Sequence, residues 1–146
     1  SRWMDQGASQ ALVMLRVPDR LTSGQVETMF KAHIADKTNW RTMLKGAPDK
    51  QDLEAEKQRL LAELQPELDK LRDEKGLQAI SETDTAAVEI DYPVTAYPDK
   101  IKSINLDKTP SFSGTLQGIK GQYWMLDENR VINMRKYAGY ELTVSY

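Results

Sequence analysis

The run Ala11–Val17 (ALVMLRV) constrains the fold of this chain more than any other stretch. Six of its seven residues are apolar, so it has the length of one strand but no polar face. Strands of this kind are usually covered on both faces, and Pro18-Asp19 ends the run. The run therefore needs neighbouring strands. We expect them from missing N-terminal strands upstream, from the C-terminal sheet or from a second chain.

A well-marked helix follows this strand. Thr22-Ser23-Gly24-Gln25 matches a capping box, in which Thr22 and Gln25 each bond the other's backbone N–H group. Because His33, the sole histidine, falls on the apolar face of this helix, we expect it to pack there rather than act as a ligand or base. Residues 39–45 read as a second short helix. The apolar face of the first helix has helical spacing and consists of Val26, Met29, Phe30, His33 and Ile34.

Charge is uneven along the chain, although the net charge is only −2. Residues 1–47 hold seven Lys/Arg against four Asp/Glu, residues 48–77 hold six against nine, and residues 78–146 hold seven against nine. Pro66 lies within the acidic middle segment, so this segment is either a long kinked helix or a helical hairpin whose second helix starts at the proline. Its leucines recur at helical spacing: Leu53, Leu60, Leu61, Leu64, Leu68 and Leu71.

The C-terminal part has the pattern of a sheet. Apolar and acidic residues alternate from Val88 to Val94, which predicts a half-buried strand. Glycines interrupt the long run 112–126, where bends or bulges are expected, and Asp127 to Arg130 reads as a turn before a return strand. Leu142, Val144 and Tyr146 alternate in the same way, which predicts a last strand. Short strands and frequent turns favour an antiparallel sheet or a small β-barrel.

The predicted fold class is therefore α+β, in three parts. Residues 1–47 form a strand with flanking helices, residues 48–77 form the Leu-striped helical segment, and residues 87–146 form the sheet or barrel. The polar stretch 77–86 is the expected boundary. The chain contains no cysteine, which excludes disulfides and thiol chemistry. No stretch approaches the ~20 apolar residues of a membrane span, so we expect a cytoplasmic protein without membrane contact.

The order of these elements resembles a known nuclease fold. RWMDQGA, then the strand, then the helix beginning at Thr22, is similar to the second half of a GIY-YIG nuclease domain. The chain as a whole, with TNWR and the run from Gly114 to Tyr146, also resembles a bacterial family of uncharacterised proteins. The two strands that bear the GIY-YIG Tyr and Gly residues are absent. Since the chain opens at Ser1-Arg2-Trp3-Met4, we expect it to be the C-terminal portion of a longer protein.

The resemblance implies a chemistry for two residues. Arg2 falls where the nuclease family has its catalytic Arg, and Glu27 falls where it has the Glu that binds a metal, usually Mg²⁺. Such a pair would imply phosphodiester cleavage of DNA or RNA, with Glu27 as metal ligand and Arg2 offsetting phosphate charge. A structural role is open for both, because Glu27 can pair with Lys31 and Arg2 can pack beside Trp3. A degenerate, inactive nuclease remains the alternative.

The C-terminal sheet supplies a second set of candidate residues. Aromatic side chains mixed with cations on a small barrel are typical of proteins that bind single-stranded nucleic acid. Core packing is the alternative for most of these aromatics, and Trp3 and Trp40 are also expected to be core anchors. A non-enzymatic module, in which the sheet or the Leu-striped helices bind a protein partner, is the rival function. The candidate nucleic-acid-binding residues are Lys120, Tyr123, Trp124, Arg130, Arg135 and Lys136.

Overall fold

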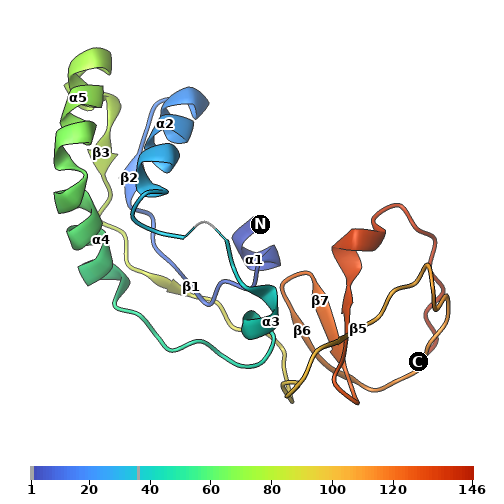
Figure 1. Ribbon diagram of the computed structural model, residues 1–146. Coiled ribbons are helices and arrows are strands. Elements are labelled where there is room, and N and C mark those ends of the chain that lie inside the picture. Colours follow the sequence, from blue (N-terminus) through green and yellow to red (C-terminus); the bar gives the residue numbers. More distant parts are fainter. Residues whose placement is uncertain (1, 36) are drawn as a thin grey trace. The chain divides into compact units, whose positions relative to one another are not determined.

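The computed structural model describes residues 2–35 and 37–146, which divide into two compact units (Figure 1). We call the first the helical unit, which comprises Gln10–Thr38 and Asp49–Glu89. The second is the sheet unit, which comprises Ser1–Ser9, Asn39–Pro48 and Ile90–Tyr146. Each unit is built from segments far apart in the sequence, so neither corresponds to one continuous stretch of the chain. Mixed helices and strands confirm the predicted α+β class.

The helical unit contains a two-stranded ribbon that supplies the neighbours of the Ala11–Val17 run. β1 (Gln10–Ala11) pairs with β4 (Val88–Glu89), and β2 (Leu15–Arg16) pairs with β3 (Ser81–Glu82), both antiparallel. Between these two strand pairs, the N–H of Thr83 donates to the carbonyl of Met14 at 3.1 Å. The stretch 77–86, which we expected to be a polar connector, therefore contains β3, one of the two partner strands. The apolar run itself is two short strands rather than one.

The helices of this unit carry its hydrophobic core. α2 (Arg20–Phe30), α4 (Leu53–Glu63) and α5 (Gln65–Lys75) are followed by the short 3₁₀ helix η1 (Leu77–Ala79). Figure 1 shows α4 and α5 following one another, so the segment is a long kinked helix rather than a hairpin. Pro66 lies in the first turn of α5, as the sequence predicts. The buried core residues are Val26, Phe30, Leu60, Leu61, Leu64, Leu68, Leu71, Ala79 and Ile80.

The start of α2 differs from the predicted capping box. Asp19 is the N-cap, and its carboxylate accepts the backbone N–H of Thr22 at 2.7 Å and the Thr22 hydroxyl at 2.9 Å. These bonds lower the pKa of Asp19. Thr22 is completely buried, and its backbone N–H and its hydroxyl are both bound to Asp19 rather than to Gln25. Asp19 competes better than Thr22 because a carboxylate is the stronger acceptor.

The sheet unit contains a four-stranded sheet in the order β5-β8-β7-β6. Its strands are β5 (Lys102–Ser103), β6 (Leu116–Lys120), β7 (Tyr123–Leu126) and β8 (Arg130–Asn133). β6, β7 and β8 form an antiparallel meander, whereas β5 runs parallel to β8. Across the described residues this sheet does not close into a barrel. Three short helices complete the unit: α1 (Arg2–Asp5), α3 (Trp40–Met43) and the 3₁₀ helix η2 (Met134–Tyr137).

The turn between β7 and β8 confirms the prediction for Asp127 to Arg130, with positive φ angles at Glu128 (54°) and Asn129 (64°).

The predicted last strand is wrong. Leu142 and Val144 lie in an extended segment without strand pairing, and both side chains are exposed. Alternation alone does not make a strand, because strand preference depends on packing against neighbouring strands. In the described part of the chain, no helix has the length and apolar character needed to cross a membrane.

Candidate nucleic-acid interface

Helix α1 is held on the turn between β6 and β7 by backbone contacts. The N–H of Gln122 donates to the carbonyl of Asp5 at 3.0 Å, and the Tyr92 hydroxyl donates to the carbonyls of Met4 at 3.1 Å and Ala8 at 2.9 Å. The approach requires glycine at position 121, where φ is +58° and a Cβ atom would lie 2.9 Å from the Met4 carbonyl oxygen. The position of α1 is therefore set by the sheet unit.

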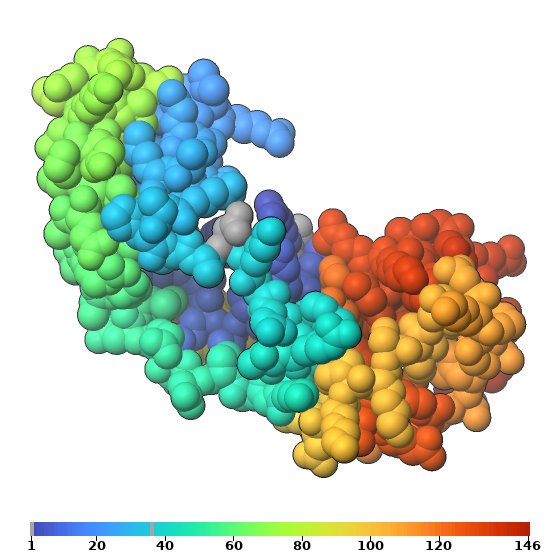
Figure 2. Space-filling view, in the orientation of Figure 1, coloured from blue at the N-terminus to red at the C-terminus, as the bar shows by residue number. Residues whose placement is uncertain are grey.

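Exposed cations lie on α1 and on η2, and an ion pair joins these two helices. The guanidinium of Arg135, on η2, donates to the carboxylate of Asp5. Lys136 follows on the same short helix and is exposed. Arg2, also exposed, lies three residues before Asp5 and so on the same side of α1. Figure 2 shows the dark-blue α1 segment beside the orange and red segments of the sheet unit.

We call the exposed parts of α1 and η2 together the α1–η2 face and define it by Arg2, Trp3, Asp5, Arg135 and Lys136. Trp3 is 60% exposed, contrary to the expectation that it anchors the core. Together, the face combines three exposed cations, one exposed aromatic ring and one acid. Cations beside an aromatic surface are the combination that binds phosphates and unstacked bases.

The other candidates in the sheet are placed differently. Lys120 is only 1% exposed, and its Nζ donates to the carbonyls of Met43 and Gly46, both at 2.9 Å. Burial lowers the pKa of Lys120. Its ammonium group also lies 5.2 Å from the centroid of the Tyr97 ring. Lys120 therefore holds the end of α3 against the sheet rather than offering its charge at the surface.

The aromatic candidates near α3 pack in the core. Tyr123 is buried and stacks on Trp40, with ring centroids 5.5 Å apart and an interplanar angle of 3°. The Arg41 guanidinium carbon lies 4.3 Å from the centroid of the Trp40 ring. Trp40 therefore has Tyr123 on one side and Arg41 over its ring. Trp124 packs against a second cluster around Ile132.

Arg130 is bound at the β7–β8 turn. Its guanidinium donates to the Asp127 carboxylate and to the Ser113 carbonyl, the latter at 2.8 Å. Arg130 also lowers the pKa of Asp127 through this hydrogen bond. Among the six candidates from the sheet, Arg135 and Lys136 are thus the exposed ones. Arg135 pairs with Asp5 of α1, and the Lys136 ammonium group lies 5.3 Å from the centroid of the Tyr137 ring.

The two residues implied by the nuclease resemblance belong to different units. Arg2 is in α1 of the sheet unit, and Glu27 is in α2 of the helical unit. The Glu27 side chain is 62% exposed, and its carboxylate lies 3.9 Å from the ammonium group of Lys31. Over the residues described, no group of three or more His, Cys, Asp and Glu is arranged to hold a metal ion.

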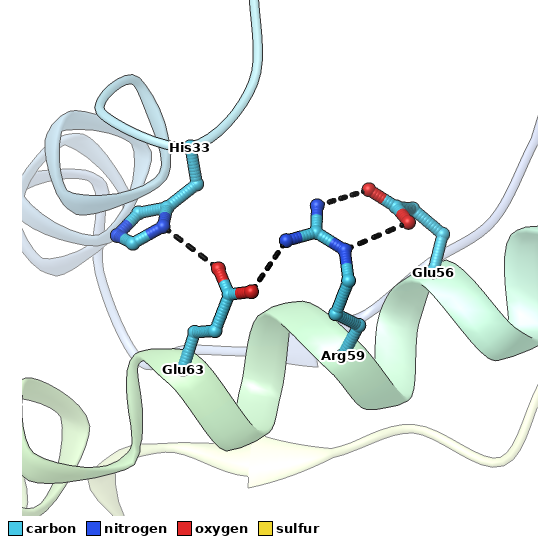
Figure 3. A network of polar contacts seen from close by, with 4 residues as sticks. All are labelled: His33, Glu56, Arg59 and Glu63. Carbon is cyan, nitrogen blue, oxygen red and sulfur yellow. Dashed lines mark hydrogen bonds and ion pairs between the residues drawn. The ribbon is translucent and has the colours of Figure 1, made fainter.

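A polar network joins the turn after α2 to α4 in the helical unit (Figure 3). Nδ1 of His33 lies 2.9 Å from Oε2 of Glu63, and Arg59 donates to Glu63 at 2.6 Å. Arg59 also binds Glu56, and these hydrogen bonds lower the pKa values of both glutamates. His33 is exposed in the turn that follows α2, so the expectation that it packs on the apolar face of the helix is wrong. Its ring is bound to a carboxylate, and the network ties this turn to α4.

The two units also differ in charge. The sheet unit has ten Lys/Arg against seven Asp/Glu, a net charge of +3. The helical unit has ten against fifteen, a net charge of −5. The cations of the α1–η2 face therefore belong to a positively charged unit, which favours contact with a polyanion.

Asp5 is the member of the face that sequence reasoning missed. It lies 130 positions from Arg135, and no local pattern around either residue indicates the other.

Comparison with known proteins gives one finding: a family model described as "Protein of unknown function (DUF2797)" matches residues 1–142. No curated protein and no solved structure shows a significant match to the chain.

Proposed function

The chain belongs to this family of unknown function, and we propose that it binds single-stranded nucleic acid through the α1–η2 face. The observation that carries the proposal is the exposed Trp3 on the same short helix as Arg2, with Arg135 held at that helix and Lys136 next to Arg135. The net charge of +3 in the sheet unit supports it.

The chemistry of the ligand follows from these groups. The cations contact backbone phosphates, and each phosphate neutralised releases bound counterions, so binding weakens as salt rises. An unstacked base can pack on the Trp3 indole ring, a contact typically worth ~1–3 kcal/mol. Bases in a duplex are already stacked on one another. The combination therefore favours single strands and little sequence preference.

Fluorescence anisotropy with short labelled DNA and RNA strands tests this proposal. We expect binding at low salt that weakens as salt rises, and Trp3→Ala should reduce the affinity about tenfold. Lys136→Glu should weaken binding severalfold, because a phosphate contact becomes a repulsion. Lys70→Glu, the same charge reversal at an exposed site on α5, is the matched control and should act less than Lys136→Glu. No affinity at low salt, or equal effects of the two reversals, would reject the proposal.

Cleavage of the bound strand is a separate, finer proposal, based on the resemblance to GIY-YIG nucleases. A Mg²⁺ ion bound at Glu27 would act as a Lewis acid on the phosphate. The described residues do not assemble a metal site around Glu27, and Arg2 lies in the other unit, so we derive no catalytic step from the structure. The supporting observation is that the Glu27 carboxylate is exposed at the surface of a stable helix.

A nicking assay decides whether cleavage occurs. If the finer proposal holds, product appears only with Mg²⁺, and Glu27→Gln abolishes it. Glu54→Gln, an exposed acid in the first turn of α4, should leave the rate unchanged. If the original protein yields no product with Mg²⁺, or Glu27→Gln cleaves as fast, cleavage is rejected and the binding proposal stands on its own test.

The rival function is a protein-interaction module. The leucine stripe does not support it, since Leu60, Leu64 and Leu68 are buried in the helical unit's own core. The extended C-terminal segment does favour it, because Tyr140, Leu142 and Val144 alternate along it and are exposed. This rival becomes the better conclusion if the binding experiment finds no affinity for either DNA or RNA.

A further inference from the structure

The α1–η2 face contains one acid among its cations, and that acid is already bound to one of them. The Asp5 carboxylate accepts a hydrogen bond from Arg135 and lies on the side of α1 that carries Arg2. A carboxylate bound to a guanidinium occupies the donors that would otherwise bind a phosphate. The pair therefore opposes the binding of a strand at this point.

The position of Asp5 is set by its backbone. Its carbonyl accepts from Gln122 at 3.0 Å, and α1 lies against Gly121, where no side chain could be added without contact. The Asn133 carboxamide accepts from the N–H of Lys136 at 3.3 Å, which anchors η2. The Asp5 carboxylate and the Arg135 guanidinium thus lie together because α1 and η2 are each held in place by backbone contacts.

The pair itself is at the surface. The side chain of Arg135 is 62% exposed and that of Asp5 is 37% exposed. Exposed ion pairs contribute little to stability, because water and salt screen them. A phosphate can therefore displace the carboxylate at small cost, so the contact can weaken binding without preventing it.

We propose that the Asp5 carboxylate competes with phosphate for the Arg135 guanidinium. By binding Arg135, it limits the affinity of the α1–η2 face for nucleic acid. The inference rests on the proposed function. Binding then exchanges ion partners: Arg135 leaves the carboxylate for a phosphate, and Asp5 turns to solvent. Removal of the carboxylate charge leaves Arg135 free and also removes a repulsion between Asp5 and the strand.

Asp5→Asn tests the inference, measured by anisotropy with the same labelled strands. We expect affinity to rise about three- to tenfold at low salt. The slope of log K against log salt should also steepen by ~0.7, the value for one more phosphate contact on a single strand. Asp99→Asn is the control, because it makes the same change in net charge at another exposed acid of the sheet unit. It should raise affinity less and leave the slope unchanged.

A double-mutant cycle separates competition from a structural effect. In an Arg135→Gln background, Asp5→Asn should lose most of its gain, since there is no guanidinium left to release. Thermal unfolding of each variant checks that the fold is retained. If the original protein binds but Asp5→Asn gives no gain, or no more than Asp99→Asn, the inference is overturned and the proposed function remains. If neither the original protein nor Asp5→Asn binds, the proposed function itself fails.

Discussion

Replacement of Lys120 by alanine should lower the free energy of unfolding by about 3 kcal/mol, because it removes two hydrogen bonds from a buried ammonium group. Those bonds hold the carbonyls of Met43 and Gly46 at the end of α3. Without Nζ, both acceptors lose their donor, and the space left by the side chain adds a cavity cost. Lys120→Met keeps much of the apolar stem and should recover part of the loss.

Urea unfolding followed by tryptophan emission measures this effect. All three tryptophans, at positions 3, 40 and 124, belong to the sheet unit, so their emission follows the unit that contains Lys120. Lys102→Ala is the control, because Lys102 is an exposed cation on β5 of the same sheet. It should change stability by less than about 0.5 kcal/mol. Equal effects of the two alanine substitutions would show that the carbonyl contacts of Lys120 contribute nothing.

Leu68→Ala should destabilise the helical unit by about 2–5 kcal/mol. Leu68 is 1% exposed and packs in the cluster formed by α2, α4, α5 and the segment after them. Truncation leaves a cavity among large side chains. Far-UV circular dichroism is the measurement, because the three longest helices among the described residues belong to this unit.

Leu77→Ala gives the matched comparison for Leu68. Leu77 is the same residue type, begins η1 in the same unit and is 77% exposed. Its truncation should cost less than about 0.5 kcal/mol, since little apolar surface is buried there. A loss at Leu77 as large as that at Leu68 would contradict the packing of the core described above.

The elements that the sequence predicted well are those specified by local chemistry. Pro66 could only start a helix or bend one, and it does both between α4 and α5. The stretch Asp127 to Arg130 forms the turn between β7 and β8, where Glu128 and Asn129 adopt positive φ. Helical spacing of the leucines also predicted the side of α4 and α5 that is buried.

The sequence predictions failed where an interaction joins residues that are far apart in the sequence. The apolar run Ala11–Val17 predicted that neighbouring strands pair with it. Nothing in the run indicated that residues 81–89 supply those strands. The segment 142–146 has the alternation of a strand but does not pair with a strand of the described residues. The positions of Lys120 and Trp3 were opposite to expectation, one buried and the other exposed. Residue type predicts burial only on average, because packing decides which lysine is enclosed.

The sequence by itself determined the α+β class, the helices, the turns and the supply of cations in the last third of the chain. Only the tertiary structure decided which of those cations reach the surface and which residues surround them. The ion pair of Asp5 with Arg135 spans 130 positions and exists because α1 is held on the β6–β7 turn next to η2. Local sequence encodes backbone preference, whereas a binding surface depends on contacts between distant segments, and those form only when the chain has folded.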